Sequence, residues 1–224
     1  LQDVQAIIGQ ESHHAFNFSK WTQRLAEKYP DVARVDHACS KTFTGMTQRS
    51  KKFQIGFVAG YETFTFLGGL IILQRYHELM GEADPVMRAI WVWHQVEEVE
   101  HGAVAFDFYN AFYREDEWFR KFMVVRAFGH ILSETFKAYA PMVRGEGLYK
   151  TPGKALKAWG FFCRFGFDLA WSALPVLKRG YHPRNHPICT NAQNPIALAW
   201  REHHQNGGDV LSLNDSIMSA LLKT

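Results

Sequence analysis

Cysteine is scarce in this sequence. The 224 residues include only three, Cys39, Cys163 and Cys189, and none of them stands close to another. An odd number without a close pair supports neither a disulfide framework nor a cysteine-based zinc or iron–sulfur site. We therefore expect the protein to work in a reducing compartment, the cytoplasm.

An excess of charge of one sign is also lacking. The 25 basic and 22 acidic residues nearly balance and leave a formal net charge of +3. No basic block alternates with aromatic residues in the way that follows a nucleic-acid backbone, so nucleic acid is not expected as a partner. Charged residues interrupt every strongly apolar stretch before it reaches the length of roughly 18 residues that a membrane span needs. No secretory signal is visible. We expect a soluble protein without a transmembrane segment.

Runs of alternating β-branched residues, the signal for strands, are absent. Instead, 47% of the residues are hydrophobic, and they recur at helical spacing in long segments. Asp84-Pro85, an N-cap residue followed by proline, marks one clear helix start. The pattern predicts an all-α fold in a single domain, 1–224. Bundle helices are expected at about 1–29, 51–80 and 85–113, with additional helices at about 116–140, 152–179 and 209–222.

The connections are less regular. Residues 31–50 predict a short helix and a link, Pro141 predicts a helix end, and the tail from Gly180 is expected to be irregular. Glycines inside the 51–80 helix indicate close contact with a neighbouring helix, and they are Gly60, Gly68 and Gly69.

Two short motifs place an acidic and an imidazole side chain one helical turn apart. Glu11 and His14 form the first Glu-x-x-His, and Glu98 and His101 form the second. Residues at i and i+3 project from one face of a helix, so each pair could reach one metal ion. The second pair lies in a strongly apolar helix, where an unpaired buried carboxylate would cost many kcal/mol. A compensating cation is the simplest explanation.

Glu62 adds a further carboxylate. It is the only acidic residue between Lys52 and Arg75, and aromatic residues surround it. A Glu-x-x-His on each of two helices and a single glutamate from each of two others is the ligand set of di-iron carboxylate bundles. We therefore expect two divalent metal ions, with iron as the first choice and manganese or zinc as alternatives.

Three sequence segments resemble those of a known family, and they are Gly9-Gln-Glu-Ser-His-His14, Trp93-His-Gln-Val-Glu-Glu-Val-Glu-His101 and Tyr181-His-Pro. In this order they closely resemble a bacterial family of predicted metal-dependent hydrolases, which is similar to the ferritin-like superfamily. The resemblance covers most of the chain, from about residue 5 to residue 187. It implies a ferritin-like helical bundle with extra C-terminal helices.

The resemblance also implies a position for each ligand. Glu11 and His14 match the ligand positions of the second bundle helix, Glu62 that of the third, and Glu98 with His101 those of the fourth. These five residues are the metal ligands that we expect.

A sixth ligand, a glutamate on the first bundle helix, has no counterpart in this sequence. The chain opens at Leu1, without a methionine, directly into a helical pattern. We expect the natural protein to have an upstream helix that carries the missing ligand. Glu134, four residues after His130, is a rival for the sixth position.

Neighbours of the ligands have expected roles of their own. Gln10 and Glu97 each stand directly before a ligand glutamate, and either could hydrogen-bond the ring N–H of a ligand histidine and fix its tautomer. A solvated carboxylate is an equally good interpretation of Glu97. His94 lies one turn before Glu98 and faces the same way. It could therefore act as an extra ligand or as a proton relay. His94 and Glu97 are the candidate catalytic residues.

Three functions are compatible with this ligand set. The first is a di-iron oxidase or oxygenase that uses O2 against an apolar small-molecule substrate. The alternative is a hydrolase that uses metal-activated hydroxide, with Glu97 taking the proton. A metal-binding or storage protein without catalysis is the third. We favour redox chemistry because four carboxylates and two imidazoles suit O2-active iron and no Ser-His signature accompanies them. The oligomeric state is open, a homodimer included.

Overall fold

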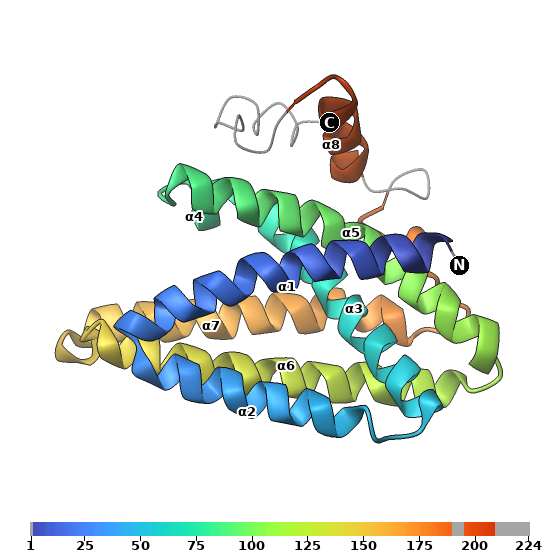
Figure 1. Ribbon diagram of the computed structural model, residues 1–224, viewed down its shortest axis with the longest axis horizontal. Helices are drawn as coiled ribbons and strands as arrows, with labels where there is room; N and C mark the ends of the chain where they lie inside the picture. The colour runs from blue at the N-terminus through green and yellow to red at the C-terminus, as the bar shows by residue number, and fades with distance from the viewer. Residues whose placement is uncertain (1, 190–194, 209–224) are drawn as a thin grey trace. The chain divides into compact units, whose positions relative to one another are not determined.

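Figure 1 shows the computed structural model of the protein, which describes residues 2–189 and 195–208. Every regular element within these two ranges is helical, which confirms the predicted all-α class. The helices are α1 Gln2–Lys28, α2 Pro30–Met46, α3 Lys51–Gln74, α4 Tyr76–Met80, α5 Pro85–Tyr113, α6 Glu117–Gly145, α7 Pro152–Ser172 and α8 Pro195–Gln205. Short 3-10 turns cover Leu148–Lys150, Leu174–Leu177 and Pro183–Asn185.

Two helices of the N-terminal half differ from the sequence prediction. The second helix, α2, is a full helix where a short one and a link were expected, because Pro30 opens it at the first helical position and Val32 is buried. The predicted 51–80 helix is interrupted at Arg75, whose φ of −104° and ψ of 27° separate α3 from α4. The Arg75 guanidinium pairs with Glu78 of α4 at 2.7 Å.

The prediction that Pro141 ends a helix is wrong, because α6 continues past it to Gly145. A proline inside a helix removes one backbone hydrogen bond and crowds the preceding turn. Anchors on both sides of Pro141 keep the chain helical. Tyr139 donates a hydrogen bond to the carbonyl of Ala158 at 3.0 Å, and Val143 is buried. Tertiary packing therefore outweighs the local signal.

The C-terminal region also departs from the prediction. The helix expected at 152–179 ends as α7 at Ser172, and α8 was not predicted at all. The buried side of α8 includes Ala199 and Trp200, but the helix is short and only its first half is apolar. The helix predicted at 209–222 lies outside the described residues.

The chain divides into two compact units. The first contains Leu1–Tyr61 and Trp118–Trp171, and the second contains Glu62–Glu117 and Ser172–Thr224. The boundary falls inside α3, which begins in the first unit and continues in the second. A single ferritin-like domain over the whole chain stays a prediction.

In the first unit, α2 runs back along α1, as Figure 1 shows, and α6 packs on both α3 and α7. Gly60 of α3 lies against the α6 backbone, where a Cβ atom would come within 2.6 Å of the Met123 carbonyl oxygen. Met123 and Ala127 are buried beneath this contact. The close approach that the sequence predicted at Gly60 is therefore confirmed.

In the second unit, α3 and α5 approach each other closely at two glycines. A Cβ atom on Gly69 would lie 2.9 Å from the carbonyl oxygen of Gln95, and one on Gly102 would lie 2.8 Å from the Cβ of Phe66. Leucines of α3, among them Leu70, are fully buried on this side. The two helices thus form the core of the second unit, and α8 and the Pro183–Asn185 turn pack on α5.

One helix of the described ranges, α3, is long and apolar enough to cross a membrane by length and composition, although Glu62 lies within it. The absence of a transmembrane segment stays a prediction. The most apolar window of α3 has a mean hydropathy of 1.5, and 56% of that window is buried. Helices that are apolar all round also form the cores of globular proteins. The contacts of α3 with α5 and α6 account for its composition in that way.

Gly102→Ala should lower the free energy of unfolding by about 1–3 kcal/mol, because the added methyl group forces α3 and α5 apart. The control is Gly129→Ala on α6, where a Cβ atom meets nothing within 4 Å. That change should raise stability by up to about 1 kcal/mol through helix propensity. Chemical denaturation measures both, and equal stability of the two variants would contradict the close contact.

Candidate metal centre

The second Glu-x-x-His lies in the buried middle of α5. Glu98 is 4% exposed and His101 is fully buried. Because they are three residues apart on a helix, the two side chains leave the same face. The His101 Nδ1 atom lies 3.6 Å from Glu98 Oε2. A carboxylate and an imidazole thus meet where water has almost no access.

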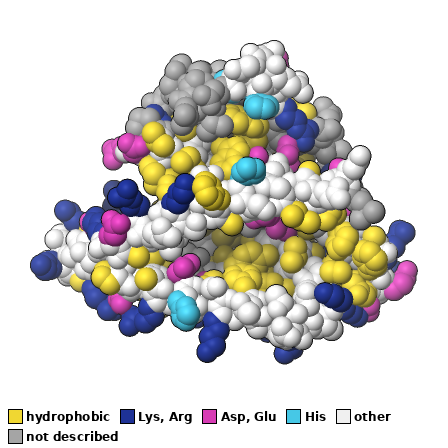
Figure 2. All heavy atoms as spheres, viewed as in Figure 1, with side chains coloured by type: hydrophobic (Ala, Val, Ile, Leu, Met, Phe, Trp, Pro, Cys, Tyr) yellow, Lys and Arg dark blue, Asp and Glu magenta, His cyan; other side chains and the backbone are white. Residues whose placement is uncertain are grey.

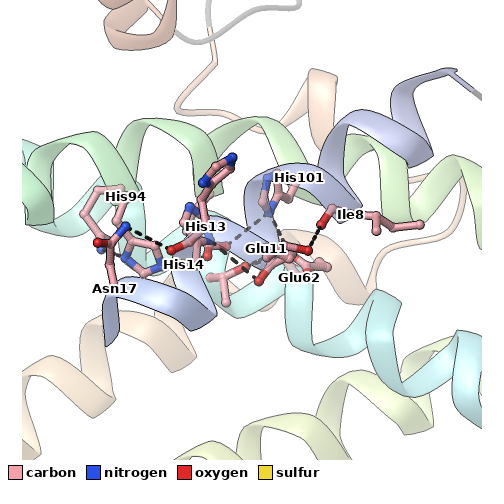
Figure 3. Close-up of polar contacts among 12 residues, drawn as sticks. Ile8, Glu11, His13, His14, Asn17, Glu62, His94 and His101 are labelled. Atoms are coloured by element: carbon pink, nitrogen blue, oxygen red, sulfur yellow. Dashed lines mark hydrogen bonds and ion pairs between the residues drawn. The ribbon is translucent and has the colours of Figure 1, made fainter. Parts of the chain in front are cut away.

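Glu62 joins this pair from α3. Its Oε2 atom also lies 3.6 Å from His101 Nδ1, and Figure 3 shows the two side chains meeting between their helices. Thr65, one turn later on α3, donates a hydrogen bond to the same Glu62 oxygen at 3.0 Å. Gly102 makes the arrangement feasible, since a side chain there would collide with Phe66 and approach the Glu62 carbonyl to 3.3 Å.

The spacing of these three groups suits a bound cation. A distance of 3.6 Å is too long for an ordinary N–H···O hydrogen bond. Two ligand atoms that each bind one metal ion at about 2.0–2.2 Å are separated by about 2.8–3.1 Å in octahedral and about 3.3–3.6 Å in tetrahedral geometry. Glu62, Glu98 and His101 also offer ligand atoms that lie within 4.8 Å of one another. The residues therefore fit a metal ion such as iron or zinc.

Histidines control the charge of Glu98. Burial by itself opposes ionisation and raises the pKa of this carboxyl group, but the interactions with His101 and His94 outweigh burial and hold the pKa well below its usual range. The His94 Nε2 atom lies 2.9 Å from Glu98 Oε1, within hydrogen-bond distance. Glu98 is therefore a carboxylate at neutral pH, as a metal ligand has to be.

Gln95 determines which ring nitrogen of His94 is the donor, because the Gln95 Nε2 atom lies 2.8 Å from His94 Nδ1. An amide nitrogen can only donate, so Nδ1 accepts this bond and the ring proton sits on Nε2. His94 then donates to Glu98. This assignment makes His94 a group that orients a ligand carboxylate, and it leaves Glu98 Oε2 facing His101.

The first Glu-x-x-His lies on α1, in the first unit. His14 Nδ1 lies 3.6 Å from Glu11 Oε2, the same separation as in the α5 pair. His14 is buried, whereas the side chain of Glu11 is 44% exposed. The neighbouring His13 is exposed. Figure 3 shows Glu11 and His14 on adjacent turns of α1. The spacing again suits two ligands of one ion.

The other predicted residues have different surroundings. Glu97 is partly exposed and leaves α5 about 100° away from Glu98, and Gln10 is partly exposed on α1. Glu100 pairs with Arg201 of α8 at 2.6 Å. Glu134 lies in the first unit, where its Oε1 atom accepts a hydrogen bond from Lys137 at 2.7 Å. Its role as a sixth ligand stays a prediction.

Sequence reasoning missed two supporting residues, Thr65 and Gln95. Thr65 could have been found as a hydroxyl one turn after an isolated buried glutamate, whereas the role of Gln95 has no signal in the sequence. Asp107 accepts a hydrogen bond from His182 at 2.8 Å, which fastens the Tyr181-His-Pro string to α5. His186 is buried with its Nε2 atom 3.0 Å from the Ser172 carbonyl.

An all-helical fold that places a buried Glu-x-x-His pair beside a third carboxylate fits a metal-binding protein. Comparison with protein families identifies the group. The family model described as "Predicted metal-dependent hydrolase" matches residues 1–187, and the chain belongs to this family. No significant match is found among curated proteins or solved structures.

Glu98→Ala and His101→Ala should each lower metal content at least about tenfold, because each would remove one of the expected ligands. Glu100→Ala is the matched control on the same helix, since Glu100 pairs with Arg201 instead. Elemental analysis of the purified proteins measures the result. Equal metal content in all three variants would remove Glu98 and His101 from the ligand set.

Proposed function

We propose that the protein is a metal-dependent enzyme whose ligands include Glu62, Glu98 and His101. The observation that carries the proposal is the position of His101 Nδ1, buried and 3.6 Å from an oxygen of each glutamate. Two carboxylates held this close to each other repel, and a divalent cation bound between them would reverse the sign of that interaction.

We further propose that Glu11 and His14 supply ligands to a second ion. This step rests on the sequence pattern, in which two Glu-x-x-His motifs and a single glutamate match the ligand set of ferritin-like di-metal proteins. The equal 3.6 Å separation within each motif supports it, because both pairs are spaced as ligands of one ion. Oxygen-rich ligands without cysteine favour iron, with manganese or zinc as alternatives.

Iron bound by these residues would supply activation of O2 for oxidation of an apolar small molecule. The protein residues have separate tasks in this scheme. Thr65 and His94 hold the two glutamates in place through their hydrogen bonds. The buried surroundings of His101 exclude bulk water from the ligands. Glu97, beside Glu98 and partly exposed, is placed to exchange protons with solvent.

Hydrolysis is the second candidate, and the family description favours it. The same ligands could hold an ion that acidifies water, and Glu97 would then take the proton as a general base. Metal binding or storage without turnover is the outcome that remains if neither reaction occurs.

Addition of Fe(II) without oxygen, followed by air, should produce a visible ligand-to-metal absorption band in the redox scheme. The control is Glu98→Ala treated in the same way, which should stay colourless. Protein that is purified with zinc, stays colourless with iron and cleaves ester or amide substrates would contradict the oxidase proposal and support hydrolysis.

Glu11→Ala and His14→Ala should reduce metal stoichiometry by about half if the α1 pair serves a second ion. His13→Ala, a change of the exposed neighbour, is the control and should leave stoichiometry unchanged. Titration with Fe(II) under anaerobic conditions gives the number of ions per chain. Unchanged stoichiometry in all three variants would restrict the centre to the residues of the second unit.

A further inference from the structure

The outer face of α7 exposes apolar side chains that no described part of the chain covers well. These residues recur at i, i+7, i+11 and i+15 along one side of the helix, and they are Leu156, Cys163, Phe167 and Trp171. Leu156 is 76% exposed, Phe167 63% and Trp171 65%. We call this stripe the α7 outer face.

A second exposed stripe lies on α6, the helix against which α7 packs. Trp118 is 83% exposed, Phe122 57% and Val125 60%, at i, i+4 and i+7. Figure 2 draws one side of the molecule, and hydrophobic side chains reach the surface there. Lysines and arginines lie mostly near the margins of that view. Both stripes belong to the first unit, so the feature does not depend on the placement of the second.

The charge of the same segment is unlike that of the rest of the chain. Residues 118–171 contain nine lysines and arginines and three acidic residues, a net charge of +6 in a chain whose total is +3. The remaining residues are therefore net negative. Lys157 directly follows Leu156, and Arg164 directly follows Cys163, so both lie on the same flank of the α7 outer face. The one acidic residue of α7, Asp168, is less exposed than they are.

A stripe of leucine, phenylalanine and tryptophan with basic residues along its flank is the composition of helices that lie in a membrane interface. Tryptophan favours the level of the lipid headgroups, and each lysine or arginine is attracted to anionic lipid. Two copies of this surface would repel each other because both are positive. Nucleic acid would match the charge, but Leu156 and Val125 have no ring to stack on bases.

We propose that the α7 outer face docks on the surface of an anionic phospholipid bilayer. The apolar stripe enters the headgroup region, and Lys157 and Arg164 on its flank contact lipid phosphates. This proposal is independent of the metal chemistry. If both hold, the bilayer is also the place where an apolar substrate would be most concentrated.

The test is co-sedimentation of the full chain with phosphatidylcholine vesicles, with and without about 30% phosphatidylglycerol. We expect binding to the anionic vesicles only, with loss of binding at about 1 M salt because charge is screened. Phe167→Ser with Trp171→Ser should abolish sedimentation, whereas Phe112→Ser, which changes an equally exposed phenylalanine of the second unit, should not.

Charge variants test the basic flank separately. Lys157→Glu, which reverses a charge on that flank, should weaken binding at least about tenfold. Glutamate near the start of α7 is compatible with the helix dipole, so the helix should persist, as circular dichroism can verify. Lys41→Glu with Lys51→Glu, two exposed lysines of the same unit, is the control and should retain most of the binding.

Cys163 provides a direct reporter, because it is exposed on the α7 outer face. With Cys39→Ser and Cys189→Ser, an environment-sensitive fluorophore on Cys163 should shift to the blue when anionic vesicles are added. Equal binding to neutral vesicles, wild-type binding by the α7 variants, or a label shielded by a dimer or by nucleic acid instead of lipid would overturn the proposal.

Discussion

Buried carboxylates that face an imidazole impose the main constraint on the second unit. Glu98 and His101 have almost no contact with water, and Glu62 adds a further negative charge on the neighbouring helix. Holding two carboxylates close to one imidazole costs free energy, and a bound cation would offset that cost. Much of the local structure holds the three groups in place: Gly102 lets α3 and α5 approach, and Thr65 orients one carboxylate.

The same constraint explains why the candidate ligands stood out in the sequence more clearly than the residues that support them. Glu98 and His101 were recognisable because charge in an apolar helix is rare, and Glu62 because it stands alone among aromatic residues. Thr65 and Gln95 are ordinary residues in ordinary positions, and only the geometry of the helices gives them partners. A hydrogen bond between neighbouring side chains leaves no periodic pattern.

The fold shows a similar division. The ends of long amphipathic or apolar helices with clear start or stop residues were predicted to within a residue or two, as for α5, which begins after the N-cap residue Asp84. The errors lie where tertiary packing overrides local preference, as at Pro141, or where a helix buries only a few residues, as in α8. The break at Arg75 belongs to the same group, since no proline or glycine marks it.

Membership of a family of predicted metal-dependent hydrolases agrees with a metal centre, and the chemistry of that centre depends on which ion it holds. X-ray absorption at the metal edge of freshly purified protein, prepared without chelators, tests the central claim most directly. The account predicts a first shell of nitrogen and oxygen only, at about 2.0–2.2 Å, with the outer scattering of imidazole. A sulfur shell at about 2.3 Å, or protein that folds fully without any metal, would contradict it.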